Sequence, residues 1–232
     1  MTMKTWHTIV ASLSVGAALT LGAGPRAHAD DDVPVDVTQN PGCGVTLKTK
    51  EEKIARNKRL AQYYFQGWNS ETMKQHDRQY RFEDHDCFAS DATFRMGFGL
   101  EPEPPEFVKV PYRRPSDRPP PKASDSPFMK ALPNWGTVPG TLRIVPWENG
   151  CYFIMRFGGN TPSGERIEFW EVDLIEINDA GKITHWEGYN DTLGVDRLFR
   201  VAFGKSVKEL GRLENMMRPP PGGEAAPKAG TR

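Results

Sequence analysis

The sequence predicts an α+β fold, in which helices near the start of the chain precede a mostly antiparallel sheet and a last helix. The main observation is a β-hairpin: two runs rich in β-branched and aromatic residues, 166–177 and 182–190, flank an Asn-Asp-Ala-Gly turn signal at 178–181. The second is the stretch 48–68, where apolar residues recur near helical spacing. The third is 196–217, which is again helical in pattern.

The remaining elements follow from local signals. A second helix is expected to start with a Ser70 or Thr72 cap and to run toward Glu83. An apolar strand opens at Cys151, and Gly194 is expected to break the hairpin pattern before the last helix.

The chain divides into four parts, and the third contains an insertion. A signal peptide is expected over 1–29 and an extended leader over 30–47, followed by one domain over 48–218. Within that domain, 101–139 is a proline-rich insertion that excludes regular helix and central strand, and it is expected to form a lid or a strap across a neighbouring subunit. The tail, 219–232, is rich in proline, glycine and alanine and is expected to be disordered.

The hairpin register decides which side chains share a face. A turn of two or four residues places Asp173 opposite Trp186 and Glu171 opposite Gly188, with Asn190 on the same face. A turn with an odd number of residues would exchange the two faces.

Three segments together resemble a known superfamily. They are 59–69 (RLAQYYFQGWN), 88–96 (FASDATFRM) and 179–191, where a turn with Gly-Lys-Ile leads into a Trp-containing strand that ends in Asp. In this order they resemble the nuclear transport factor 2-like superfamily, in its branch of SnoaL-like polyketide cyclases and limonene epoxide hydrolase-like proteins. With 141–158 they cover most of the chain between residues 51 and 204. The resemblance implies a cone-shaped barrel, in which a curved sheet wraps around the N-terminal helices and encloses a pocket.

The hydrolase chemistry of that branch is not expected here. The resemblance implies an Arg-x-Asp on a middle strand and an acid on the last strand, which align with Arg156-Phe157-Gly158 and with the stretch that begins at Gly188. Glycines stand at both carboxylate positions, so the acid and base that deliver water to an epoxide are missing. The polyketide-cyclase reading meets the same Gly188.

A different pair of acids is the candidate catalytic site. Glu171 and Asp173 share one face of a strand, where burial and mutual repulsion raise the pKa of one of them, so the pair can serve as acid and base, with Asp173 as the candidate general base. The alternative is a structural role, in which Arg156 neutralises Asp173 in a buried ion pair. The candidate ligand-binding residues around the pair are Tyr64, Arg156, Trp186 and Asn190.

Two other groups of residues contain side chains that could be catalytic or bind a metal. A register slip of one residue would bring His185 and Glu187 to the pocket face. The run 84–87 (Asp-His-Asp-Cys) contains metal-ligand residue types, but adjacent residues after a helix point in different directions. Neither a metal nor a cofactor is therefore expected.

The start of the chain predicts export to the periplasm or secretion. Lys4 supplies a positive charge, 9–21 is apolar, and Ala27-His28-Ala29 forms a cleavage site before Asp30. The apolar run is shorter than the roughly 20 residues of a membrane span. Cleavage removes two basic and no acidic residues and leaves a net charge of 0 − 2 = −2, so nucleic acid is not an expected partner.

An oxidising compartment permits a disulfide. Of the 3 cysteines, Cys151 lies in an apolar strand and is expected to be a buried thiol, so the expected bridge joins Cys43 to Cys87.

Two classes of function remain open. One is an enzyme that works by acid/base chemistry on a small apolar or aromatic molecule, as an isomerase, cyclase or dehydratase. The other is a non-catalytic ligand-binding or assembly module. A homodimer is expected in either case, because the hairpin face opposite the pocket carries Trp170, Val172, Leu174 and Tyr189.

Overall fold

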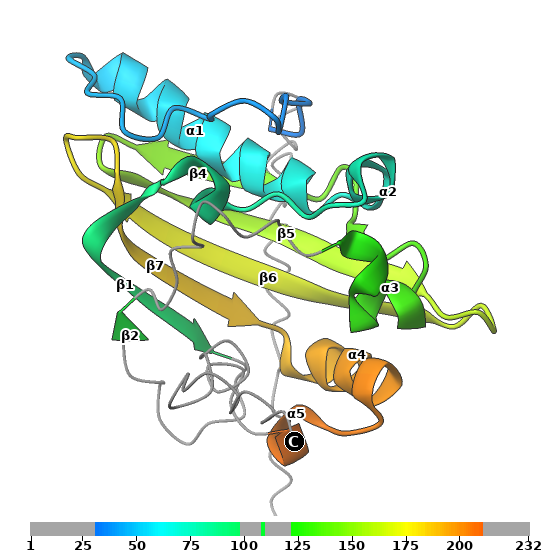
Figure 1. Cartoon of the computed structure of the whole chain (residues 1–232). Coiled ribbons are helices and arrows are strands. Elements are labelled where there is room, and N and C mark those ends of the chain that lie inside the picture. Colours follow the sequence, from blue (N-terminus) through cyan, green and yellow to red (C-terminus); the bar gives the residue numbers. More distant parts are fainter. Residues whose placement is uncertain (1–30, 98–107, 110–121, 211–232) are drawn as a thin grey trace, which may run out of the picture.

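The structure, a computed structural model, describes residues 31–97, 108–109 and 122–210. Its centre is a curved, mostly antiparallel sheet, with the long helix α1 across one face and shorter helices at its ends (Figure 1). This arrangement confirms the predicted α+β fold with N-terminal helices against a curved sheet. The signal peptide, 101–107 and 110–121 of the insertion, 211–217 of the predicted last helix, and the tail lie outside the described residues.

The helices are α1 (Lys50–Gly67), α2 (Ser70–His76), α3 (Pro127–Ala131), α4 (Thr192–Phe203) and α5 (Val207–Leu210), with short 3-10 turns η1 (Phe82–His85) and η2 (Ala123–Asp125). The strands are β1 (Phe88–Gly97), β2 (Val108–Lys109), β3 (Gly136–Thr137), β4 (Arg143–Trp147), β5 (Gly150–Asn160), β6 (Arg166–Ile177) and β7 (Ile183–Asn190). They pair in the order β2-β1-β7-β6-β5-β3, and β4 also pairs with β5. Only β1 and β7 run parallel among the described strands. No described helix combines the length and the hydropathy that a membrane span requires.

Helix α1 forms where the apolar spacing predicts it. The Thr49 side chain accepts a hydrogen bond from the backbone N–H of Glu52, and the Glu52 carboxylate accepts one from the backbone N–H of Thr49, so the first turn is closed by a capping box. The helix then buries Leu60, Tyr63 and Tyr64, on the side of β4 and β5. Helix α1 thereby places the hydroxyl of Tyr64 in the interior.

Helix α2 is shorter than the prediction. Asn69 caps it instead of Ser70 or Thr72, and it ends at His76 because Asp77 adopts a left-handed conformation with φ 45°. The chain then runs without helix until η1, so it does not continue regularly toward Glu83.

The β6–β7 hairpin has the predicted faces but a different register. Asp173 lies opposite Gly188, not Trp186, and Glu171 lies opposite Asn190, not Gly188. Two shifts of one residue each cause the difference. The turn between the strands is one residue longer than predicted, and the register shifts by one more residue next to Ile177. The pairing therefore moves by two residues, which leaves every side chain on its predicted face.

Two further predictions are wrong, one about Gly194 and one about the insertion. Gly194 does not break the pattern before the last helix but lies within α4, where a Cβ would meet the Glu168 carbonyl oxygen at 2.3 Å. The helix begins at Thr192 with Asp191 as its cap and is interrupted at Gly204, which has φ 70°. The insertion also contains a regular helix, α3, because Pro127 occupies its first turn, where proline is tolerated.

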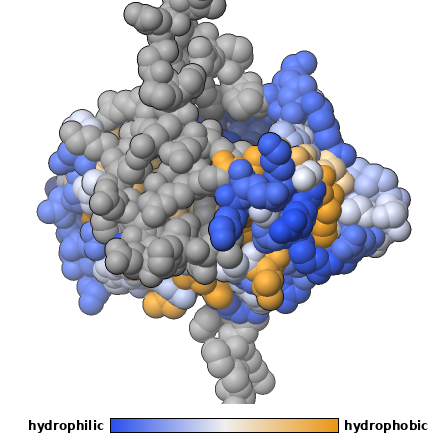
Figure 2. Space-filling model, turned by 90° about the horizontal axis from the view of Figure 1, so that it is seen from below, coloured by the Kyte–Doolittle hydropathy of each residue, from blue (hydrophilic) through white to orange (hydrophobic). Residues whose placement is uncertain are grey.

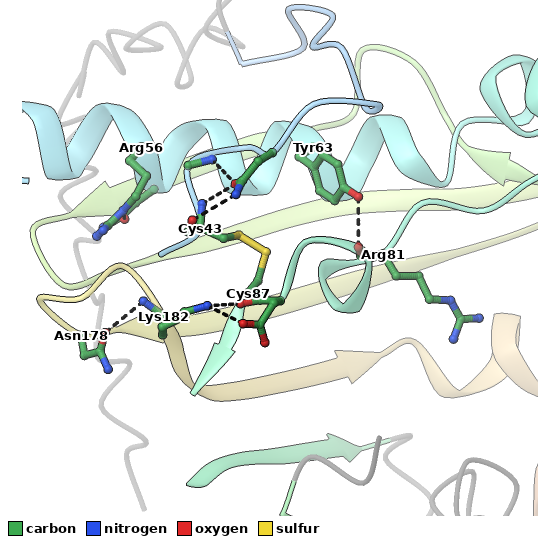
Figure 3. Close-up of a disulfide and its surroundings, with 11 residues drawn as sticks. Cys43, Arg56, Tyr63, Arg81, Cys87, Asn178 and Lys182 are labelled. Carbon is green, nitrogen blue, oxygen red and sulfur yellow. Dashed lines mark hydrogen bonds and ion pairs between the residues drawn. A yellow bond between two sulfur atoms is a disulfide. The ribbon is translucent and has the colours of Figure 1, made fainter. Parts of the chain in front are cut away.

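The predicted disulfide between Cys43 and Cys87 is present and ties the leader to the start of β1 (Figure 3). The same region is held by backbone hydrogen bonding between Gly44 and Gly181, and by Lys182, which donates to the Asp86 carboxylate at 3.0 Å. Cys151 is a free, buried cysteine, as predicted.

Candidate functional site

Two buried carboxyl groups lie side by side on the inner face of β6. Asp173 is 0% exposed and Glu171 is 6% exposed. Phe153 and Met155 are their neighbours on β5, and both are also fully buried. Acidic residues are almost never buried to this extent without a partner, so the pair requires an explanation.

Each carboxyl accepts one hydrogen bond from an aromatic side chain. The Tyr64 hydroxyl donates to Glu171 Oε1 at 3.0 Å, and Trp186 Nε1 donates to Asp173 Oδ1 at 2.6 Å. No described lysine or arginine forms an ion pair with either acid. The remaining oxygen of Asp173, Oδ2, receives no hydrogen bond. Because Glu171 also offers acceptor oxygens, the two carboxyls can bond to one another only when one carries a proton.

Burial changes the protonation of both acids. It raises the pKa of Glu171 to about 7, although hydrogen bonds from Asp173 and Tyr64 lower it. Burial, together with the charge of Glu171, raises the pKa of Asp173 well above the usual range for aspartate. Both shifts favour the protonated form of the acids, so a proton can be shared between the two carboxyl groups, and Glu171 is poised between its two forms near neutral pH.

Aromatic rings cluster around Trp186, the side chain that donates to Asp173. The Trp186 ring lies 5.4 Å from Tyr64, 5.6 Å from Phe82, 6.2 Å from Phe88 and 5.0 Å from Phe94, measured between ring centroids. These rings come from α1, η1, β1 and β7, so the whole fold contributes to one apolar environment. Such surroundings exclude water and maintain the raised pKa values of the acids.

The end of β7 completes the cluster. Asn190 lies opposite Glu171, and its side-chain amide is 3.1 Å from the sulfur of Met96. Gly188 faces Asp173, and a Cβ there would lie 3.0 Å from Asp173 Oδ1 and 2.6 Å from the Met96 sulfur. Glycine is favoured at this position because the Met96 side chain and the Asp173 carboxyl occupy the space that a Cβ would need.

The structure brings together five of the six predicted site residues and separates Arg156 from them. Arg156 is on the opposite face of the sheet, where its Nη1 is 2.7 Å from Glu168 and its guanidinium stacks 4.7 Å from the Trp170 ring. Its predicted place in the interior is wrong, and so is the alternative ion pair with Asp173. His185 and Glu187 are also on the outer face, and Glu187 pairs there with Arg95 at 2.7 Å.

Sequence reasoning missed the contribution of Phe82 and Met96. The burial of Phe82 could not be predicted because η1 lacks the apolar spacing of a regular helix. The contact of Met96 with the site could not be predicted because the strand that pairs with β1 was unknown. The described residues contain no cluster of three potential metal ligands. The site thus offers proton transfer and apolar contact.

Comparison with known proteins finds only distant similarity. No family model and no curated protein matches the chain. A phenazine biosynthesis-related protein from Pseudomonas aeruginosa is 13% identical, with 66% of this chain and 88% of that one covered and a TM-score of 0.38.

Two further solved structures are similar to the chain. An NTF2-like protein of unknown function from Cytophaga hutchinsonii is 13% identical over 56% of this chain and 92% of that one, with a TM-score of 0.31. A SnoaL-like family protein from Agrobacterium tumefaciens is 14% identical over 58% of this chain and 97% of that one, with a TM-score of 0.31. At these low identities and TM-scores, the function proposed next rests on the geometry of the interior.

Proposed function

We propose that this protein is an acid/base enzyme that acts on a small apolar or aromatic molecule without a redox cofactor. Isomerisation, cyclisation and dehydration all need a group that removes a proton and a group that donates one. The observation that carries the proposal is the buried pair Glu171 and Asp173, whose pKa values are raised and which accept hydrogen bonds from the uncharged aromatic side chains of Tyr64 and Trp186.

The two acids have different roles in this proposal. Glu171 is the general base, because its pKa of about 7 is near neutral pH and it is the more exposed of the two. Asp173 stays protonated and donates to Glu171, which stabilises the carboxylate form of Glu171 until a substrate proton is transferred. Tyr64, which donates to the same carboxylate, orients it.

The experiment has two steps. Native mass spectrometry of the full protein, purified from the compartment to which cells deliver it, identifies a bound small molecule. That molecule is then incubated with enzyme in D₂O, and deuterium at its carbon atoms is measured by NMR. We expect exchange with the wild type and a loss of roughly a hundredfold or more in Glu171→Gln. Unchanged exchange in Glu171→Gln would refute the assignment of the base.

The alternative function is a non-catalytic ligand-binding or assembly module. The packing of Trp186 favours it, because four aromatic rings surround this side chain and fill the interior next to Asp173. A bound molecule that shows no exchange with solvent in the wild type would support this second function.

We also propose export as the setting of this activity. The Cys43–Cys87 disulfide supports it, since structural disulfides persist mainly in oxidising compartments. Mass spectrometry of the N-terminus of the exported protein tests it, and a chain that begins at Asp30 is the expected result.

A further inference from the structure

Three polar side chains form a rim beside the acid pair, which we call the donor rim: Trp68, Gln79 and Arg81. Trp68 follows the last turn of α1, and the other two precede η1. Arg81 Nη2 donates to Gln79 Oε1 at 2.9 Å, and the Arg81 guanidinium lies 5.7 Å from the Trp68 ring. The Trp68 ring in turn lies 6.2 Å from the ring of Tyr64, so the donor rim is continuous with the site.

Each member of the donor rim has a buried N–H group without a partner. The atoms are Trp68 Nε1, Gln79 Nε2 and Arg81 Nε. All three can only donate hydrogen bonds. A buried donor without an acceptor is unfavourable and is rare in folded proteins, so three in one place indicate that an acceptor binds there.

The donor rim also carries a positive charge that the described residues do not neutralise. Arg78, close by in sequence, pairs with Asp84 at 2.9 Å, whereas no described carboxylate forms an ion pair with the Arg81 side chain. Figure 3 shows why the two parts of Arg81 act separately: its backbone oxygen accepts from the Tyr63 hydroxyl at 3.0 Å, and its side chain extends away from Tyr63. Burial raises the pKa of Tyr64 strongly, and Arg81 opposes that rise, which places its charge near the interior.

We propose that the donor rim binds a carboxylate group of the ligand, so that the molecule taken by the site is an apolar or aromatic carboxylic acid. Planar guanidinium and carboxylate groups match in shape and form two parallel hydrogen bonds, and the neighbouring N–H groups supply further donors. The apolar body of the ligand then extends toward Tyr64 and Glu171. This inference rests on the proposed function, because it requires that the interior binds a small molecule.

Two probes that differ only in charge test the inference. Naphthalene-2-carboxylate and naphthalene-2-carboxamide have the same aromatic body, and only the first is an anion. Binding of each to the full protein is measured by isothermal titration calorimetry at neutral pH. The variants are Arg81→Gln, which removes the charge of the donor rim, and Arg59→Gln, a matched control at an exposed position of α1.

We expect the wild type to bind the carboxylate about tenfold or more tightly than the amide, because a charge-assisted hydrogen bond contributes that much. Arg81→Gln should abolish the preference without weakening the amide, and Arg59→Gln should retain it. Equal affinity for the two probes in the wild type overturns the donor rim as a carboxylate site and leaves interior binding standing. If neither probe binds, both the donor rim and the proposed interior site are overturned. The comparison within the wild type remains decisive even if Arg81→Gln fails to fold.

Discussion

At the scale of single residues, position in the interior gives two similar acids different properties. Asp173 is fully buried and accepts from Trp186, and burial raises its pKa well above the usual range for aspartate, whereas Glu171 accepts from Tyr64 and has a pKa raised to about 7. The sequence favoured Asp173 as the general base because it indicates only the position of a residue on its strand. The structure favours Glu171 because desolvation and neighbouring charge, which determine pKa values, depend on the whole fold.

The raised pKa of Glu171 predicts how stability changes with pH. The folded protein binds the proton of Glu171 more tightly than the unfolded chain does, so this contribution to stability is complete below about pH 4.5 and is lost as the pH rises to about 7. The free energy of unfolding should therefore fall between these values. Urea denaturation of wild type and Glu171→Gln across this range measures it. An identical slope in both proteins would contradict the raised pKa.

The alternation of side chains along a strand determined which site residues could be predicted from the sequence. Glu171, Asp173, Trp186 and Asn190 belong to one hairpin, and alternation along its two strands was sufficient to place them on one face. Arg156 belongs to β5, and its face depends on the register of β5 against β6 across the turn at 161–165, which the alternation within the β6–β7 hairpin does not determine. Contacts between distant segments, as between Arg81 and Trp68, have no signature in the local pattern.

At the scale of elements, the position of α4 depends on a glycine. Gly194 lets the helix approach β6 so closely that a Cβ would meet the side chain of Phe169 at 2.5 Å. We expect Gly194→Ala to destabilise the fold by about 1–3 kcal/mol, although alanine is the better helix former, because the helix must move away from the strand. Leu193→Ala is the control, since Leu193 is 77% exposed. Equal melting temperatures for the two variants would disprove the close approach.

The disulfide is the second stabilising feature at this scale. It closes a loop with a sequence separation of 44 residues, and removing such a constraint costs about 4 kcal/mol when the unfolded state gains the corresponding entropy. Cys43→Ser with Cys87→Ser should lower the free energy of unfolding by this order. Reducing agent should destabilise the wild type alone. Protein from an oxidising compartment that contains three alkylatable thiols would contradict the bridge.

At the scale of the whole molecule, the outer face of the sheet predicts self-association. Trp170, Tyr189 and Tyr152 are 39%, 40% and 37% exposed on neighbouring strands. From the side opposite α1, hydrophobic residues are visible in groups beside hydrophilic ones (Figure 2). We expect a homodimer in which this face meets its copy across a twofold axis.

Charge at the centre of this face tests the dimer. Trp170→Glu should release monomers, because twofold symmetry brings the two introduced charges near each other. Leu193→Glu adds the same charge at an exposed position of α4 and should leave the dimer intact. Light scattering measures both. A monomeric wild type at micromolar concentration would show that this face does not mediate self-association.

The protonation of the acid pair is the property on which the proposed enzyme depends. A ¹³C NMR titration of side-chain carboxyl groups in the full protein measures it directly. We predict one glutamate that titrates near pH 7 and is missing from Glu171→Gln, and one aspartate that stays protonated at neutral pH and is missing from Asp173→Asn. If instead every carboxyl group in the wild type is ionised by pH 5, the interior does not hold the proton, and the account of this site as an acid/base centre is wrong.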